Sequence, residues 1–478
     1  MSTARVAVVG GGIAGLAAAY RLRKVLGSAA EIMVIEGSRR LGGALRTVQL
    51  GGLAFDVGAE AFLMRRPEAV QLVDELGLRE QLTHPRSAAP TVRAGGRTVA
   101  LPTRTVLGLP GTAADVAGLL SERGVARVAA EPTVPLHWEP GQDAAVGRLL
   151  RERAGDELVD RLVDPLLGGV YAGRADALGL RGTLPAVASA LDRGSGSLLA
   201  AANAVLAAST PPLRGAVSPV FGTLRGGLTG LVDALVSAAA VCPRLGLPVR
   251  GLSRIPQGWR LQLGSAHRPE HIDAGAVVLA LPAPALRRLL ADPLPAASAA
   301  AGRVEVASCA VVGLALPIAA AQTLPQSSGV LVAASETREW SLSAKAFTFS
   351  GRKWAHASSH EVMLLRASLG RHGETQVLQR DDGELIELVR ADLAALTGIT
   401  ASPVDTVVAR WGGGLPQYAP GHLDAVTALE DAVAAVPGLA VAGAMLRGVG
   451  LPACIGTGDA AAVRIAAHVG AGVPAVGG

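Results

Sequence analysis

Apolar and polar residues follow two different periods along the chain, and the changes of period predict its elements. Near the N-terminus, Arg5–Gly10 (RVAVVG) is a short aliphatic run typical of a buried parallel strand, and LAAAYRLRKVL after it has the composition of a helix. The strand pattern returns in EIMVIE, which ends at Glu36, in AGAVVLAL before Pro282, and in LAVAGA (Leu439–Ala444). We therefore expect an α/β domain assembled from segments that lie far apart in the sequence.

The middle of the chain carries other patterns. From Leu101 to about Pro212 the sequence is rich in Ala and Leu at helical spacing, which predicts a helical insertion. TVRAGG and RTVALP predict a strand pair that turns through Gly95–Gly96. Between about 300 and 410, several apolar runs alternate with polar residues and none ends in a phosphate-binding loop, which predicts an antiparallel or mixed sheet.

These patterns predict three parts. The discontinuous α/β domain comprises residues 1–85, 213–289 and 411–478, the sheet domain comprises 86–102 and 290–410, and the helical insertion comprises 103–212. At the C-terminal end, we expect the glycine-rich loop RGVGLPACIGTG to lead into a helix that has Asp459 in its first turn.

Composition excludes several classes of protein. Half of the 478 residues are hydrophobic, and the mean hydropathy is +0.39, but charges interrupt each apolar run before it reaches the length of a membrane span. We expect a cytoplasmic protein and leave open a peripheral contact with the inner face of the cell membrane. The net charge of +5 comes with only 3% aromatic residues, which argues against nucleic-acid binding by stacking and favours a small anionic ligand. Three widely separated cysteines predict neither a disulfide framework nor a metal site.

A phosphate-binding pattern follows the first predicted strand. GGGIAG places glycines at Gly10, Gly12 and Gly15 between a strand and a helix, where backbone N–H groups and the helix dipole attract a pyrophosphate. Glu36 follows about 20 residues later, where dinucleotide-binding folds place an acid on the ribose hydroxyls. The sequence therefore predicts a Rossmann-like dinucleotide site, and this stretch alone leaves NAD and FAD open.

The next segment favours FAD. After Glu36, the sequence fits E-x-x-x-R-x-G-G at Arg40, Gly42 and Gly43, and Asp56 and Gly58 follow. This arrangement resembles the second fingerprint of the large flavin family that contains amine oxidases, phytoene desaturases and protoporphyrinogen oxidases. Arg40 can offset pyrophosphate charge, and the paired glycines let the backbone pass close to it. The resemblance implies FAD and the amine oxidase/p-hydroxybenzoate hydroxylase-like arrangement of the cofactor domain.

Further motifs narrow the resemblance. RWGGGLPQYAPGH, AGAMLRGVGLPACI, DPLLGGVYAG and FTFSGRKW resemble the protoporphyrinogen/coproporphyrinogen oxidase family, in its Gram-positive and actinobacterial form. One departure is GAEA (Gly58–Ala61), where this group often has Gly-Pro-Glu-Ser. The resemblance implies that FAD contacts Gly10, Gly11, Gly12, Ile13, Ala14, Gly15, Glu36, Arg40, Gly42, Gly43, Gly58, Ala59, Glu60, Ala61, Val249, Trp411, Gly448, Val449, Gly450 and Leu451. The bare loop at Gly448–Gly450 would bring N–H groups and a helix dipole against the flavin pyrimidine.

The family resemblance also implies the reaction. Coproporphyrinogen III would be oxidised to coproporphyrin III by successive hydride transfers to FAD, with dioxygen as the oxidant, hydrogen peroxide as a product, and no catalytic acid or base. A transient contact with a ferrochelatase is left open. For the substrate we expect Arg65, Gly169, Tyr171 and Lys345, with Arg66, Arg352 and Lys353 as further candidates for carboxylate recognition.

Other functions stay open. Protoporphyrinogen IX would be an alternative substrate. An amine oxidase or a carotenoid desaturase would share the fold, and Trp411 and Tyr418 would then form part of an aromatic cage. A non-catalytic prenyl-protein escort would share the fold without the flavin, but the intact glycines at both ends of the chain argue against it.

Overall fold

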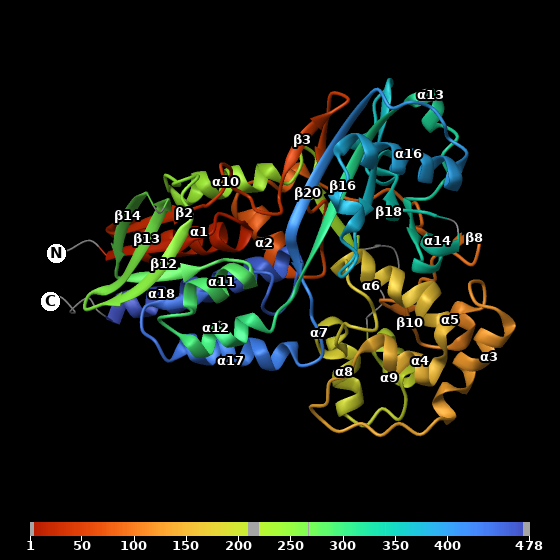
Figure 1. Cartoon of the computed structure of the whole chain (residues 1–478), viewed down its shortest axis with the longest axis horizontal. Coiled ribbons are helices and arrows are strands. Elements are labelled where there is room, and N and C mark those ends of the chain that lie inside the picture. The colour runs from red at the N-terminus through yellow and green to blue at the C-terminus, as the bar shows by residue number, and fades with distance from the viewer. Residues whose placement is uncertain (1–3, 209–218, 266, 340, 472–478) are drawn as a thin grey trace.

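The computed structural model describes residues 4–208, 219–265, 267–339 and 341–471. Figure 1 shows an α/β part that holds both ends of the described chain, a second part built on a large sheet, and a helical part. The expected boundary at residues 212 and 213 lies outside the described residues, as do the outermost residues of the first and last expected segments.

A parallel sheet forms the centre of the α/β part. Its strands follow the order β2 (Ala30–Ile35), β1 (Ala4–Val9), β15 (Ala276–Leu279) and β21 (Leu439–Val441), and every pairing is parallel. Apart from Arg5 and Glu31 near the amino ends of β1 and β2, the strands are apolar because both faces are covered. Residues Val6 and Val8 of β1 face one hydrophobic core, whereas Ala7 and Val9 face another. The predicted assembly from distant segments is confirmed.

Helices and a small sheet cover the two faces of this sheet. One face packs against α1 (Ile13–Leu26), α10 (Thr229–Ala239) and α18 (Leu451–Ala471). The other face packs against the antiparallel sheet β12–β13–β14 (Val249–Ile255, Gly258–Ser265 and Arg268–Ala274) and against α11 (Ala283–Leu290), α12 (Pro295–Gly302) and α17 (His422–Ala434).

The last helix differs from the sequence-based expectation. Helix α18 begins at Leu451, so Asp459 lies in its interior and not in its first turn. Two of the glycines that suggested a long loop, Gly456 and Gly458, belong to the helix. A Cβ at Gly458 would lie 2.3 Å from the Ala14 carbonyl oxygen of α1. Asp459 pairs with Arg21 of α1 at 3.2 Å, which ties the first and last helices together.

A seven-stranded mixed sheet forms the second part. Its strand order is β20 (Asp405–Pro416), β16 (Val306–Pro317), β19 (Val362–Leu369), β18 (Ala344–Thr348), β17 (Gly329–Val332), β7 (Thr91–Ala94) and β8 (Arg97–Ala100). All neighbours are antiparallel except β17 and β7. The predicted pair at Gly95–Gly96 is therefore an edge of this sheet. Helix α16 (Asp382–Thr397) packs its apolar side chains on one face.

The helical part has an apolar core of its own. Its larger helices are α3 (Glu122–Ala130), α4 (Val146–Ala154), α6 (Asp164–Tyr171), α8 (Pro185–Asp192) and α9 (Leu198–Ala208). The chain also contains α2 (Pro67–Glu75) and three small antiparallel sets: β3–β4 (Thr47–Leu50 and Leu53–Asp56), β5–β11–β6 (Phe62–Leu63, Phe221–Leu224 and Leu82–Thr83), and β9–β10 (Thr105–Val106 and Leu109–Pro110). Within the described ranges, no helix combines the length and the apolar content needed to cross a membrane.

Candidate functional site

The carboxyl ends of the four parallel strands meet along one edge. The ladder continues one residue beyond the strands: Gly10 N–H donates to Ile35 O at 2.8 Å, Ala280 N–H to Val9 O at 2.8 Å, and Ala442 N–H to Leu279 O at 3.0 Å. Ligands of open α/β sheets bind outside the carboxyl ends of their strands. The first glycine loop and the C-terminal glycine loop, which are far apart in the sequence, therefore open on the same edge.

The first glycine loop has a shape that only glycine permits. Gly10 has a φ of +108°, and a Cβ there would lie 2.2 Å from Ala280 O. A Cβ at Gly15 would lie 1.9 Å from Gly10 O, whereas a Cβ at Gly12 would meet only the Gly43 Cα, at 3.8 Å. Gly10 and Gly15 are thus required by the protein's own packing, and Gly12 leaves an open approach to the backbone. Ile13 and Ala14 begin α1, whose first-turn N–H groups lack partners within the helix.

Glu36 stands at the end of β2 with its carboxylate held from two sides. Oε2 accepts the Gly11 N–H at 2.7 Å, and Oε1 accepts the Ser38 N–H at 2.8 Å. A Cβ at Gly11 would lie 2.4 Å from Leu41 Cδ2 and 3.2 Å from the Glu36 Cβ, so a side chain there would crowd this approach. Each carboxylate oxygen retains a further acceptor position, which suits a pair of ribose hydroxyls. Val249 lies in the same neighbourhood, because Leu247 N–H donates to Glu36 O at 3.1 Å.

The second fingerprint folds around Arg40. Its guanidinium donates to the carbonyl oxygens of Leu41 (3.0 Å), Gly43 (2.7 Å) and Leu45 (3.2 Å), and it lies 5.6 Å from the ring centre of Trp411. Burial lowers the pKa of Arg40, and Arg46 adds to this effect. Arg40 therefore shapes the glycine loop, which contacts the first loop through the Gly42 N–H to Gly11 O bond at 2.8 Å. A direct contact between Arg40 and a pyrophosphate stays a prediction.

Trp411 joins the large sheet to this loop. Its Nε1–H donates to Val57 O at 2.9 Å, and a Cβ at Gly58 would lie 3.0 Å from the Trp411 ring and 1.9 Å from Ala44 O. Ala59 N–H donates to Ala44 O at 2.9 Å, and Ala61 packs in the same apolar cluster as Trp411. The structure thus brings Trp411 and Gly58–Ala61 together.

Glu60 is occupied by protein partners. Its carboxylate accepts the Lys353 ammonium and the Trp354 Nε1–H, both at 2.9 Å. Burial alone would raise the pKa of Glu60, but the positive charges of Lys353 and Arg366 outweigh it and lower that pKa. Glu60 is therefore an anion that anchors the FTFSGRKW segment to the cofactor domain.

The C-terminal glycine loop is held from outside by two stacked rings. Tyr418 Oη donates to Ala444 O at 2.6 Å and accepts the Gly448 N–H at 2.8 Å. The Tyr418 ring lies 3.9 Å from the His422 ring at an interplanar angle of 15°. His422 Nε2–H donates to Leu446 O at 2.9 Å, and burial lowers the His422 pKa, which favours the neutral ring. Gly450 is exposed, and a Cβ there would meet only Pro452, at 3.8 Å.

These rings also correct one expectation. Tyr418 is 1% exposed, and its hydroxyl is committed to the loop backbone, so it cannot form a wall of an aromatic cage for an amine. Val449 packs against the core of the helical part, and Leu451 begins α18. The loop therefore presents mainly backbone to the shared edge of the sheet.

The edge fits a dinucleotide. Two loops offer glycines, Gly12 and Gly450, beside which a Cβ would make only one contact, at 3.8 Å. Glu36 has free acceptor positions, and α1 offers its N-terminus. Nothing comparable serves a metal: among the described residues, no group of three or more His, Cys, Asp and Glu side chains is arranged around a common point.

Most of the candidate carboxylate-binding cations already have protein partners. Arg66 pairs with Glu68 at 2.8 Å, Lys353 pairs with Glu60, and Arg352 donates to the carbonyl oxygens of Gln322 and Leu324 at 3.1 and 3.2 Å. Arg65 is exposed at the start of α2, next to Met64, whose N–H donates to Val220 O at 3.0 Å. Arg66, Arg352 and Lys353 are therefore poor candidates, and Arg65 stays a prediction.

The other expected substrate residues lie between α6 and the large sheet. Gly169 is exposed near Leu331 of β17, Tyr171 is buried, and Tyr171 O accepts Gln417 Nε2–H at 2.8 Å. Lys345 is 6% exposed on β18, against which α6 packs. The sequence analysis missed Arg371, which lies here with a guanidinium against Gly168. Its only sequence signal is its place directly after the glycine that ends an apolar strand.

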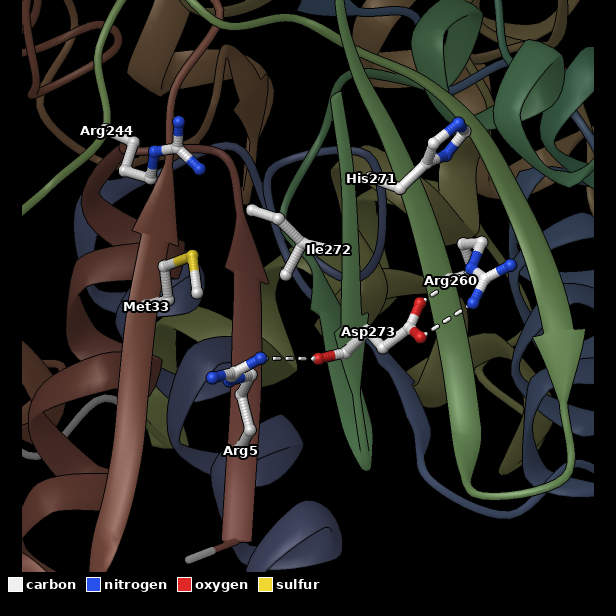
Figure 2. Close-up of a pocket in the computed structure, with 7 residues that line it drawn as sticks. All are labelled: Arg5, Met33, Arg244, Arg260, His271, Ile272 and Asp273. Carbon is white, nitrogen blue, oxygen red and sulfur yellow. Dashed lines mark hydrogen bonds and ion pairs between the residues drawn. The ribbon is translucent and has the colours of Figure 1, made fainter. Parts of the chain in front are cut away.

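A hollow elsewhere in the α/β part is unrelated to this edge. Its volume is about 490 Å³, and Figure 2 shows its lining: Arg5, Met33, Arg244, Arg260, His271, Ile272 and Asp273. Arg5 lies at the amino end of β1, opposite to Gly10. The arginines pair with Glu31, Glu270 and Asp273 at 2.8, 2.6 and 2.7 Å. These charges are balanced, so the hollow does not select an anion.

Comparison with known proteins agrees with the geometry. The pattern of the flavin-containing amine oxidoreductases matches residues 13–466. The chain is 44% identical to the coproporphyrinogen III oxidase of Mycobacterium leprae, over 98% of this chain and 100% of that protein, and 32% identical to that of Bacillus subtilis, over 95% and 96%.

The crystal structure of a putative protoporphyrinogen oxidase from Exiguobacterium sp. 255-15 superposes with a TM-score of 0.82 at 30% identity and covers 98% of this chain and 99% of its own. Cyclohexylamine oxidase from Brevibacterium oxydans shares the fold, with a TM-score of 0.69 at 16% identity, over 98% of this chain and 100% of its own. With its glycine loops meeting at one sheet edge and this similarity over nearly its whole length, the chain belongs to the family of flavin-containing amine oxidoreductases.

Proposed function

We propose that the protein is an FAD-dependent oxidase that converts coproporphyrinogen III to coproporphyrin III with dioxygen and releases hydrogen peroxide. The observation that carries this proposal is the 44% identity to the M. leprae enzyme over 98% of the chain. The committed hydroxyl of Tyr418 also speaks against an amine oxidase, because the expected aromatic cage is missing one wall.

FAD is the cofactor, and when bound it supplies the hydride acceptor and the group that dioxygen reoxidises. The chain's own residues bind and orient it. Glu36 would accept the ribose hydroxyls, and the first-turn N–H groups of α1 would face the pyrophosphate. The Gly448 N–H is held by Tyr418 Oη, so the N–H groups of Val449 and Gly450 are the ones that would face the polar edge of the flavin. The remaining residues of the two fingerprints and Trp411 close the site around them.

The substrate binds between α6 and the large sheet. Gly169 leaves room for a broad ring system, and Tyr171 supports that loop through its carbonyl contact with Gln417. The reaction needs no strong side-chain base, because pyrrole N–H protons leave as conjugation grows. The protein's contribution is therefore to place the macrocycle and to exclude water.

Two partner contacts belong to the same proposal. We infer that the enzyme makes a peripheral contact with the inner face of the cell membrane. We also infer a transient contact with a ferrochelatase, which receives the product. Val220 and Phe221 support this inference, because they expose 58% and 41% of their surface beside Arg65. Apolar side chains next to a cation suit an anionic membrane surface or a protein contact.

Anaerobic reduction of the flavin tests the function. Coproporphyrinogen III, protoporphyrinogen IX and a panel of amines are added side by side to the purified yellow protein, and loss of flavin absorbance is followed. We expect the fastest bleaching with coproporphyrinogen III. Faster bleaching by protoporphyrinogen IX would identify that compound as the preferred substrate. Bleaching by amines alone would refute the porphyrinogen proposal.

A further inference from the structure

Lys345 is a buried amine without a carboxylate partner. It is 6% exposed, and its Nζ donates to Gly370 O at 2.9 Å. Within the described part of the chain, the side chains whose charges act on it are Cys309, Arg371 and Arg366, and none of them is a carboxylate. Burial lowers the pKa of Lys345 to about 8, and the two arginines add to the effect. Burying an ammonium without an anion is unfavourable, so this position requires an explanation.

The backbone around Lys345 is built to present it. The ladder between β18 and β19 shifts register between Ala344 and Ala346, which places Lys345 in a bulge. Asp392 of α16 fixes this bulge from the far side of the sheet, because its carboxylate accepts the N–H groups of Ser343 and Ala344 at 2.9 and 2.7 Å. Bulges of this kind redirect a side chain out of the regular ladder.

A second buried cation lies beside it. Arg371 follows Gly370 directly and is 4% exposed. Its Nη2 donates to Val332 O at 3.0 Å, whereas its Nη1 is buried without any hydrogen-bond partner in the described structure. The nearest carboxylate, that of Asp164, is 3.8 Å away and already accepts Arg174 at 3.2 Å and the Ala175 N–H at 2.8 Å.

These groups border the region assigned to the substrate. Helix α6 packs on β17 and β18, and a Cβ at Gly168 of α6 would lie 2.2 Å from Arg371 Nη1, so only glycine lets the helix backbone lie directly against the guanidinium. Cys309, which lies close enough to act on Lys345, is the register partner of Trp411 across β16 and β20. The two cations therefore lie on the sheet at the level of the tryptophan that joins it to the cofactor loops.

We propose that Lys345 and Arg371 form a subsite for one carboxylate of the substrate, so that the macrocycle enters with that carboxylate leading. This inference rests on the proposed function and adds the group that the enzyme recognises. A bound carboxylate would accept a hydrogen bond from Lys345 Nζ and would supply the missing negative charge, and Arg371, enclosed behind α6, would add its positive charge to the subsite. Asp392 and Gly168 act as positioning residues for the two cations.

The test is Lys345→Met in the FAD-loaded enzyme, with coproporphyrin III as the probe and quenching of porphyrin fluorescence as the readout. We expect the dissociation constant to rise about tenfold or more, since hydrogen bonds to charged groups contribute that much. Lys345→Arg should restore part of the affinity. Lys24→Met is the matched control, because Lys24 is exposed on α1 and pairs with Glu75 at 3.0 Å. It should bind the probe as the wild type does.

Thermal unfolding separates a ligand-binding role from a structural one. If Lys345 serves the ligand, Lys345→Met should melt at the same temperature as the wild type or higher, because a buried unpaired charge has been removed. Unchanged probe affinity in Lys345→Met would overturn the subsite and leave the proposed function intact, and so would a lowered melting temperature without weaker binding. A wild-type enzyme that neither binds coproporphyrin III nor is reduced by its porphyrinogen would overturn both.

Discussion

The two glycine loops of the cofactor domain open on the same sheet edge but are held in place differently. The first loop fixes its own shape: Gly15 lies against Gly10, and Gly10 lies against the neighbouring strand. The C-terminal loop depends on Tyr418 and His422, which precede it by more than twenty residues and hydrogen-bond to its backbone at three points. A loop of the first kind is visible as a local motif, whereas the support of the second appears only in the fold.

Breaking the self-supported loop should have the largest effect. A Cβ in Gly15→Ala would lie 1.9 Å from Gly10 O. We expect a stability loss of about 1–3 kcal/mol from this overpacking and purified protein without the yellow flavin colour. Flavin absorbance per protein and thermal unfolding measure the two effects.

The matched control is Gly230→Ala in α10. Its Cβ would meet only Gln81, at 4.0 Å, so flavin content and stability should stay close to those of the wild type. A yellow, stable Gly15→Ala variant would show that the contact between Gly15 and Gly10 does not determine cofactor binding.

Removing the outside support should have a smaller effect. Tyr418→Phe keeps the stacked ring but leaves the Gly448 N–H and the Ala444 carbonyl without their shared partner. We expect FAD to bind about tenfold more weakly, which corresponds to about 1.4 kcal/mol, in a protein that remains folded. Titration of FAD into deflavinated protein gives the dissociation constant.

Tyr20→Phe serves as the control for the lost hydroxyl. Tyr20 lies on α1 and donates to Glu75 at 3.0 Å, away from the C-terminal loop, so its variant should bind FAD normally. Equal affinities of the Tyr418 and Tyr20 variants would contradict the idea that the C-terminal loop needs its external support.

The smallest expected effect is a pH dependence of the same support. Burial lowers the pKa of His422 in the folded protein below its unfolded value of about 6.5. Below that pH the unfolded state binds the additional proton, so the histidine's contribution to stability is present above pH 6.5 and is lost as the pH falls. His422→Gln keeps a donor for Leu446 O and cannot titrate.

Melting temperatures of both proteins between pH 5 and 8 check this expectation. The wild type should lose more stability than His422→Gln on acidification. Asp56 and Asp392 have pKa values raised to about 6 by burial, which favours the folded state at low pH, but both proteins contain them. Parallel curves would show that His422 is not the titrating group that matters.

The regular elements of the cofactor domain were predictable because each carries its own signal. The strands at Ala4–Val9, Ala30–Ile35, Ala276–Leu279 and Leu439–Val441 are short, mostly aliphatic runs, and a glycine, proline or acid follows each within three residues. The start of α18 was predicted wrongly, because Gly456 and Gly458 resemble a loop in the sequence although they lie inside the helix, where Gly458 packs closely against α1 and Gly456 faces Glu68 of α2. A glycine in a loop and a glycine in a closely packed helix look alike in the sequence. Only the neighbours of the residue in space distinguish the two roles.

The residues of the candidate site also fall into two groups, those that the sequence predicts and those that only the fold reveals. Glu36 and the glycines of the first loop are recognisable from spacing, because strand, turn and helix fix their relative positions within a few residues. In the sequence, Lys353 and Arg66 cannot be distinguished from unpaired cations. In the fold, nearby carboxylates neutralise both of them. The domain boundaries and the full set of cofactor contacts stay predictions.

The sequence by itself determined the short buried strands of the α/β domain, the nucleotide-binding turn and the flavin family, because each is recognised from motifs whose own residues lie close together along the chain. Only the tertiary structure decided which charges are left over for a ligand. Glu374 follows Arg371 by only three residues, yet in the fold it pairs with Arg174. Burial, which no local pattern encodes, leaves Lys345 with no carboxylate partner among the described residues and Arg371 Nη1 without a hydrogen bond.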